Sequence, residues 1–192
     1  MKPAFNAKSM SKAAVMAALC FIGTTYLMIM IPTPLGGARF HFGDVFCLMA
    51  ALLFGPLTGG LSGAIGMSLS DLVTGYAIYA PSTFIFRLVQ GSLCGLIAWP
   101  RAKNGEVTSP GLARSAAACA IATVAYIILF MGYHFIEKRY MWQAEMGTVL
   151  TDMAFRLGNS SIKAVMNVII TILLTPVFRT ALRRAGTGWV RG

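Results

Sequence analysis

Charged residues are scarce in this chain of 192 residues. They make up 11% of it, against about 25% in a typical soluble domain, whereas hydrophobic residues make up 57%. This shortage excludes an ordinary water-soluble domain and favours an integral membrane protein that lies in a lipid bilayer. A second region of different composition is also missing, so we expect a single membrane domain over residues 1–192.

Motifs for nucleotide hydrolysis and for common enzyme chemistry are missing too. The chain has no GxxxxGK[ST] phosphate loop, so it cannot hydrolyse a nucleotide by that route. It has no GxSxG or HExxH motif, and "GLSGA" and "GMSLSD" fall short of a membrane serine-protease motif. We expect no catalytic residues and no cofactor. Energy for any transport must then come from another subunit or from an ion gradient.

The cysteines and histidines lack the spacing of a metal or redox site. All four cysteines lie inside apolar blocks, and none belongs to a CxxC pair. We interpret them as small buried hydrophobic residues. Neither His41 nor His134 has a partner at metal-ligand spacing, so no metal is expected.

The apolar residues form six blocks, which predict an all-α bundle of six transmembrane helices. The predicted spans are 12–31, 43–55, 57–73, 82–99, 112–135 and 154–178. The first is about long enough to cross a bilayer and too long for the core of a signal peptide. In "FGPLTGG", Pro56 and the glycines predict a tight turn between the second and third spans. The segment 136–153 is aromatic and charged, so we expect an ordered loop over the membrane.

Basic residues are unevenly divided between the two ends of these spans. With six spans, both termini and the loop near 100–113 share one side. That side carries Lys2, Lys8, Lys12, Arg101, Lys103, Arg114, Arg179, Arg183, Arg184 and Arg191, against Glu106 alone. The positive-inside rule therefore predicts that both termini are cytoplasmic. Topology accounts for most of the net charge of +10, so no nucleic-acid partner is expected.

Polar side chains inside the predicted spans indicate function, because such groups are costly in lipid. Asp44, Asp71 and Arg87 lie at the outer ends of the second to fourth spans, with Gln90 one turn deeper. In the last span the polar residues recur every three or four positions and share one helix face. They are Asp152, Arg156, Asn159, Lys163 and Asn167. This stripe predicts a pocket that opens outward, or alternatively an internal ion pair between Lys163 and either Asp71 or Asp44.

Aromatic residues flank the same predicted pocket. Tyr76, Tyr79 and Trp142 fall in outer loops, where they suit a flat, water-soluble molecule or form an interfacial aromatic belt. Basic groups outnumber acids here, which favours a ligand with a carboxylate, a phosphate or ring acceptors. The predicted substrate-binding residues are Arg39, His41, Asp44, Asp71, Tyr76, Tyr79, Arg87, Gln90, Trp142, Arg156, Asn159 and Lys163.

Small residues four positions apart mark a second surface. Ala13 and Ala17, and the overlapping pair Ala14 and Ala18, lie at the predicted cytoplasmic start of the first span. Such spacing lets another helix approach closely. Glycine pairs elsewhere are expected to serve internal packing, whereas Ala13 and Ala17 are candidates for contact with a partner protein.

The phrases "HFGD", "LLFGPLTGG" and "SLSDLVTGYAIYAPSTFIFR", preceded by the AxxxA helix, resemble the substrate-binding S component of energy-coupling factor (ECF) vitamin transporters, in the broad riboflavin-type group. The resemblance is strongest over residues 39–95, and size and helix count extend it to the whole chain. One departure is Arg87, where lysine is expected in many relatives. Arginine keeps the positive charge of lysine but carries it on a planar guanidinium group.

The resemblance implies high-affinity capture of a water-soluble vitamin or precursor at the extracellular face of a bacterial plasma membrane. The implied partners are a membrane coupling subunit, contacted through the AxxxA helix, and two ATP-binding-cassette ATPases, either shared or dedicated. Asp44 would cap the second span. Pantothenate, a pyridoxine-like vitamin and a hydroxymethylpyrimidine-like precursor all stay open as substrates. The alternatives are a stand-alone ion-coupled or passive transporter and, less favoured, an intramembrane enzyme.

Overall fold

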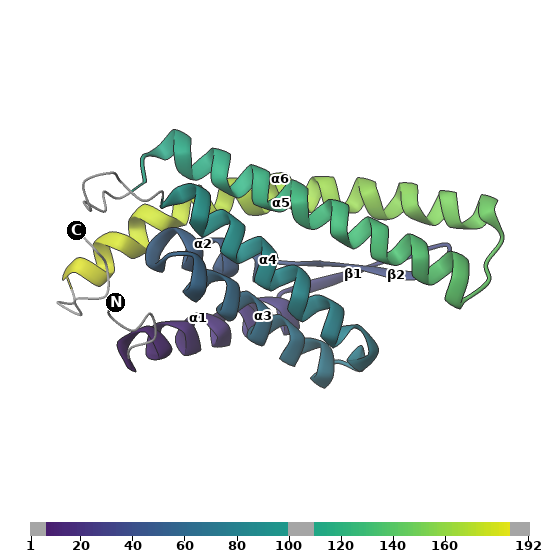
Figure 1. Ribbon diagram of the computed structural model, residues 1–192, viewed down its shortest axis with the longest axis horizontal. Helices are drawn as coiled ribbons and strands as arrows, with labels where there is room; N and C mark the ends of the chain where they lie inside the picture. Colours follow the sequence, from purple (N-terminus) through teal and green to yellow (C-terminus); the bar gives the residue numbers. More distant parts are fainter. Residues whose placement is uncertain (1–6, 100–109, 185–192) are drawn as a thin grey trace.

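The computed structural model describes residues 7–99 and 110–184. Figure 1 shows a mostly helical molecule with one antiparallel β-hairpin. Its elements are α1 (Ala7–Thr25), β1 (Met28–Thr33), β2 (Gly36–His41), α2 (Gly43–Phe54), α3 (Pro56–Val73), η1 (Ala77–Tyr79), α4 (Ala80–Ala98), α5 (Leu112–Ile136), η2 (Glu137–Met141) and α6 (Met146–Arg184). The prediction of an all-α protein is therefore wrong for residues 28–41.

The hairpin takes up the end of the first predicted span. α1 ends at Thr25, not at residue 31, and β1 pairs with β2 from Met28 opposite His41 to Thr33 opposite Gly36. Pro34 and Leu35 form the two-residue turn. Gly36 follows with φ of +115°, in the left-handed region that glycine adopts without steric cost. Proline and glycine at these positions are typical of a turn.

The short helix α2 lies at the centre of the molecule. Ten of its twelve residues are buried, because α1, α3, α4 and α6 all pack against it. An all-round apolar sequence is what a helix buried on every side requires. Its twelve residues extend about 18 Å, well short of the roughly 30 Å hydrocarbon core of a bilayer.

Helices α3 and α4 approach each other through glycine. A Cβ atom added to Gly91 of α4 would lie 2.5 Å from the carbonyl carbon of Gly59 in α3. A Cβ atom added to Gly95 would lie 2.3 Å from the Cα atom of Pro56. Neither position has room for a side chain, so the two backbones are in direct contact, as the glycine spacing predicted.

The later helices are long and apolar. Within the described residues, three helical stretches are long and apolar enough to cross a membrane: Ala77–Ala98, Leu112–Met141 and Met146–Arg184. Large apolar side chains such as Ile128, Ile162 and Leu173 are exposed on their surfaces. Extensive exposed apolar surface of this kind suits contact with lipid.

The segment 136–153 is helical for most of its length, which corrects the predicted loop. The π-helical turn η2 continues α5 to Met141, and α6 begins at Met146. Only residues 142–145 lie between the two helices. As a result, α5 and α6 form a long antiparallel pair that extends past the other helices in Figure 1.

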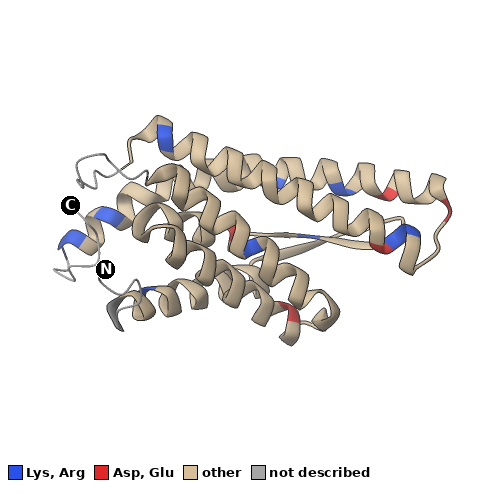
Figure 2. Cartoon of the chain, viewed as in Figure 1, with Lys and Arg blue, Asp and Glu red and all other residues tan. Residues whose placement is uncertain are grey.

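The charged residues are separated along the molecule. Figure 2 shows described basic residues and no described acidic residue at the end that holds the starts of α1 and α5 and the finish of α6. Five residues of the charge argument lie outside the described residues: Lys2, Arg101, Lys103, Glu106 and Arg191. The side chain of Lys8 is likewise not described.

Candidate functional site

A cavity of about 300 Å³ lies among the hairpin, α3, α4, α5 and α6. This volume is at the lower end of the range of roughly 300–1,000 Å³ that is typical of small-molecule sites. The lining combines aromatic rings with cations. The rings are Tyr76, Tyr79, Phe86, Tyr126, Phe130, Tyr133, His134 and Trp142, and the cations are Arg39, Arg87, Lys138, Arg156 and Lys163.

Two cations share one buried carboxylate in a cluster that we call the deep cluster: Asp44, Arg87 and Lys163. The Arg87 guanidinium pairs with Asp44 Oδ1, and Lys163 Nζ lies 3.5 Å from Asp44 Oδ2. All three residues are at most 6% exposed. Asn167 donates to the same carboxylate at 3.3 Å. Both cations line the cavity, whereas Asp44 does not, so the cavity meets the positive side of the cluster.

An aromatic ring and an amide complete the surroundings of Arg87. Its Nη1 donates to Gln90 Oε1 at 2.6 Å, and its Nη2 donates to the Tyr126 hydroxyl at 3.0 Å. The guanidinium carbon also lies 3.8 Å from the centre of the Tyr126 ring. The contact with the ring face and the hydrogen bonds to the acceptors together fix the orientation of the guanidinium plane.

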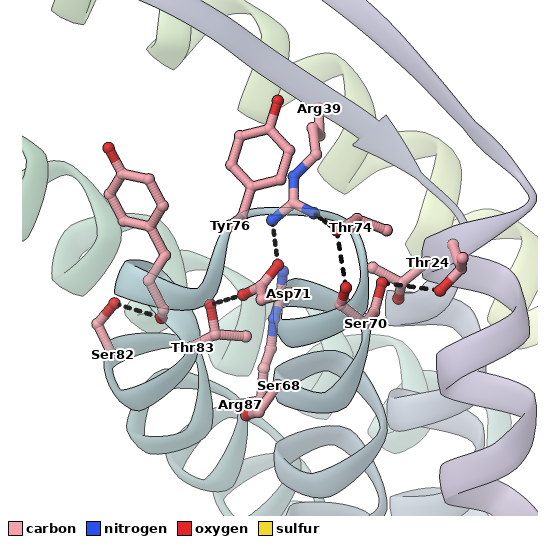
Figure 3. Close-up of polar contacts among 12 residues, drawn as sticks. Thr24, Arg39, Ser68, Ser70, Asp71, Thr74, Tyr76, Ser82, Thr83 and Arg87 are labelled. Carbon is pink, nitrogen blue, oxygen red and sulfur yellow. Dashed lines mark hydrogen bonds and ion pairs between the residues drawn. The ribbon is translucent and has the colours of Figure 1, made fainter.

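A second ion pair ties the hairpin to α3 (Figure 3). Arg39 on β2 pairs with Asp71, and Thr83 donates to the other oxygen of that carboxylate at 2.5 Å. Arg39 also lies 4.4 Å from the centre of the Tyr76 ring and donates to Thr74 at 3.4 Å. In Figure 3, Arg39 lies between the Tyr76 ring and Asp71. β2 is thereby attached to the end of the α3–α4 pair where α3 finishes and α4 begins.

The turn of the hairpin is held by α6. Asp152 accepts from Arg156 Nε at 2.6 Å and from the backbone N–H of Leu35 at 3.0 Å. Arg156 in turn donates to Thr33 and to the Gly37 carbonyl, each at 3.5 Å. The polar stripe of α6 therefore binds the turn in the N-terminal part of the helix and reaches the deep cluster at Lys163. That lysine lies about 25 Å along the helix from Met146, at 1.5 Å rise per residue.

Another carboxylate organises the end of α5. Glu137 accepts from the Tyr79 hydroxyl at 2.7 Å and lies 2.7 Å from His134 Nδ1. Lys138 Nζ lies 3.8 Å from the same carboxylate and 3.1 Å from the centre of the Trp142 ring. This cluster brings η1, α5 and η2 together on one side of the cavity.

Several buried polar atoms beside the cavity have no hydrogen-bond partner among the described residues. They include His41 Nδ1, Gln90 Nε2 and Asn167 Oδ1. Burial, together with the nearby Lys163 charge, lowers the pKa of His41 well below its usual range, so its imidazole is neutral at pH 7 and adds no charge. Unsatisfied buried polar atoms are costly, and a bound polar molecule can satisfy those that face the cavity.

The structure brings the twelve predicted site residues together. Ten line the cavity, and the other two, Asp44 and Gln90, lie directly behind Arg87 and bind it. The expectation that Asp44 caps α2 is wrong, since its side chain makes no capping hydrogen bond and faces Arg87 instead. For Lys163, pocket lining and ion pairing with Asp44 both occur. Contact of these residues with a ligand stays a prediction.

Some lining residues were missed because their sequence signals were weak. Tyr126 and Phe130 fall within an apolar run, where aromatic residues are ordinary core residues. His134 was considered only as a metal ligand and was rejected in that role. Its spacing of three residues to Glu137 is that of neighbours on one face of a helix. That pair, with Tyr79, would have indicated a polar cluster at this end of α5.

The alanine face predicted to bind a partner is packed inside the molecule. Ala13 and Ala17 are 9% and 7% exposed. Ser62 of α3 donates to the Ala13 carbonyl at 3.3 Å, and a Cβ atom added to Gly66 would lie 2.2 Å from the Ala17 carbonyl oxygen. The overlapping pair, Ala14 and Ala18, is exposed.

Two solved structures share this fold. The S component of a bacterial ECF transporter has a TM-score of 0.63 at 19% identity, over 91% of this chain and 97% of that one. FolT bound with folic acid has a TM-score of 0.58 at 18% identity, over 88% of this chain and 95% of that one. At these identities the comparison establishes the fold alone.

Sequence comparison is more specific. An uncharacterized protein from Pyrococcus woesei is 34% identical over 74 residues, which are 38% of this chain and 49% of that protein. The chain thus spans about half the length of this curated relative. The family model described as ECF-type riboflavin transporter, S component, matches residues 4–183. S components are membrane-embedded, vitamin-binding subunits of transporters and not enzymes. The resemblance drawn from residues 39–95 is confirmed, and the chain belongs to the ECF-type riboflavin transporter S component family.

Proposed function

We propose that this protein captures a water-soluble vitamin or vitamin precursor at the extracellular face of a bacterial plasma membrane. It then passes the ligand inward only when joined to a membrane coupling subunit and two ATP-binding-cassette ATPases. The observation that carries this proposal is the cavity itself. Its cationic and aromatic lining comes from the hairpin, from residues 76–79, from α4 and α5, and from the segment that runs through η2 into α6. The family consists of vitamin-binding transporter subunits.

In the proposed topology, six helices form one membrane domain, with the short α2 enclosed by the others, and both termini lie in the cytoplasm. Figure 2 shows basic residues gathered at one end of the molecule, which supports this orientation. Lys12 belongs to the first part of α1, Arg114 to the start of α5 and Arg183 to the finish of α6. The cavity residues Arg156 and Trp142 belong to the other half of the molecule, near the start of α6. With that half outward, the cavity is accessible to extracellular solute.

The proposed docking surface for the coupling subunit is the exposed small-residue pair on α1. Ala14 and Ala18 are four residues apart and exposed, so another helix can approach the α1 backbone there. This assignment replaces Ala13 and Ala17, which are buried.

The test separates binding from transport. Cells that express this chain alone should bind a radiolabelled vitamin without accumulating it, because the chain carries no phosphate loop. Accumulation should appear when the coupling subunit and both ATPases are co-expressed. The vitamins to test are riboflavin, pantothenate, pyridoxine and hydroxymethylpyrimidine, and native mass spectrometry of the purified protein can identify a ligand that stays bound.

Two controls complete this experiment. The full complex with an inactivated ATPase should bind and not accumulate, which shows that accumulation needs hydrolysis. The purified chain alone in liposomes should show no ATP-independent uptake. Rapid uptake by the chain alone would instead support the stand-alone transporter.

A further inference from the structure

We infer that the ligand of this site carries one negative charge, as a carboxylate, which binds against Lys163 and Arg87. The inference rests on the proposed function, since it specifies the ligand of the same cavity. It comes from the charge balance of the cavity wall and from the direction in which the charges face.

Five cations line the cavity, and four carboxylates neutralise them. Three of the cations have a carboxylate of their own: Arg39 has Asp71, Arg156 has Asp152 and Lys138 has Glu137. The remaining two cations, Arg87 and Lys163, share the single carboxylate of Asp44. Among the described residues, the cavity wall therefore holds one positive charge without a matching negative charge, and that charge belongs to the deep cluster.

The excess charge is buried, which makes its compensation important. Arg87 and Lys163 are 3% and 6% exposed, so little water can solvate them. A buried charge without a partner is strongly unfavourable. The charge also faces the ligand space, because both cations line the cavity while Asp44 lies behind them. An anionic group placed in the cavity meets the two cations before it meets their carboxylate.

Neighbouring groups fit a carboxylate better than a phosphate. One carboxylate supplies one negative charge and neutralises the cluster, whereas a phosphate monoester carries about −1.5 to −2 at pH 7. Two further neighbours are neutral: His41, whose Nδ1 has no partner among the described residues, and Asn159. The Asp71 carboxylate also acts on Arg87, and it is already paired with Arg39. The centre of the Tyr126 ring lies 3.8 Å from the Arg87 guanidinium carbon and 5.7 Å from Lys163 Nζ, so one aromatic ring adjoins both cations.

The experiment uses pairs of ligands that differ in charge at one group. The carboxylate pairs are pantothenate with pantothenol, nicotinate with nicotinamide, and pyridoxate with pyridoxine; riboflavin phosphate with riboflavin tests the phosphate. Affinities are measured by calorimetry on the full chain in detergent. For the pair that the site accepts, we expect the carboxylate to bind roughly tenfold tighter or more than its neutral partner, as for a charge-assisted contact.

Three variants assign this preference to Lys163. Lys163→Met should bring the ratio between the two members of the pair close to one, and Lys163→Arg should retain the preference. Asn159→Leu removes a polar group without changing charge, so it should weaken both members equally. Because Asp44 keeps Arg87 as its partner, Lys163→Met should also leave thermal unfolding nearly unchanged, and this shows that a loss of preference does not come from misfolding.

The outcomes separate this inference from the proposed function. If a neutral vitamin co-purifies or binds as tightly as its carboxylate analogue, the inference is wrong while the proposed function stands. Tighter binding of riboflavin phosphate than of every carboxylate would also overturn it. If Lys163→Met lowers the affinity for both members of a pair equally, the lysine has a structural role and does not select a charged ligand. No binding of any member, with nothing retained on purification, would overturn both proposals.

Discussion

The packing of α1 to α4 against one another and the wall of the cavity, which lies among the hairpin, α3, α4, α5 and α6, are built by opposite means. In the bundle, helix backbones are in direct contact at glycine residues, which have no side chain, as at Gly59 and Gly91. In the cavity region, segments meet through charged and aromatic side chains, as at Arg39 with Asp71. The first region is close-packed, and the second encloses about 300 Å³ of space.

This difference predicts what each region tolerates. A close-packed interface has no room for an added methyl group, so it is sensitive to volume. Beside a cavity, a side chain can change its size because there is free space next to it. If one partner of a buried ion pair is removed, however, the charge of the other partner is left uncompensated. The bundle should therefore respond to size and the cavity region to charge.

The largest effect is expected where a charge change removes the shared partner of two cations. Asp44→Asn keeps the shape of the side chain and leaves Arg87 and Lys163 facing each other without an acid. We expect a loss of about 3–5 kcal/mol in unfolding free energy, as for other broken buried pairs. Chemical unfolding in detergent, followed by tryptophan fluorescence, measures it.

Asp71→Asn is the matched control for this charge change. It makes the same replacement at a pair whose cation, Arg39, is 17% exposed in its side chain and can take up water in place of the acid. Its effect should be clearly smaller. Equal effects for the two variants would mean that burial of the cation does not set the cost.

A smaller effect is expected from a size change in the bundle. Gly91→Ala adds one carbon atom that would lie 2.5 Å from the Gly59 backbone. Since backbone cannot move aside as a side-chain tip can, we expect a loss of about 1–3 kcal/mol. Gly132→Ala makes the identical change on α5, where nothing lies within 4 Å of the added carbon, and should gain up to about 1 kcal/mol from helix propensity. A loss in both variants would remove the distinction between the regions.

The same difference explains which parts of the fold could be predicted from the sequence. The bundle helices were predicted to within two residues at each end for 43–55, 57–73 and 82–99, because turns with glycine and proline separate continuous apolar blocks. The hairpin was missed because "MIMIP" continues the apolar run of α1 with no charged residue in between. The signal was present in "TPLGG", whose proline and glycines are turn residues, but hydrophobicity outweighed it.

The candidate site was predictable to the extent that polar residues are conspicuous in apolar sequence. The stripe from Asp152 to Lys163 has helical spacing and a high contrast with its surroundings. The start of α6 was placed eight residues late, at residue 154, because the loop predicted from the charged and aromatic stretch "EKRYMWQAE" was extended to residue 153. Pairings such as Arg39 with Asp71 join residues 32 positions apart, and no local pattern specifies such distant partners.

The smallest effect on stability, and the sharpest on function, is expected on the exposed face of α1. Ala14→Leu and Ala18→Leu change side chains that are exposed on the surface of the bundle. Surface changes of this kind usually alter stability by no more than about 0.5 kcal/mol. A leucine there nevertheless blocks close approach of a second helix, so we expect loss of co-purification with the coupling subunit and loss of vitamin accumulation, with vitamin binding by the isolated chain retained. Ala17→Leu provides the opposite pattern, because it adds volume at a position that is 7% exposed and should lower the unfolding temperature of the isolated chain. Affinity purification of the co-expressed complex and thermal unfolding of each variant measure the two effects. If Ala14→Leu and Ala18→Leu leave co-purification intact, the exposed face of α1 contacts lipid and the coupling subunit binds elsewhere.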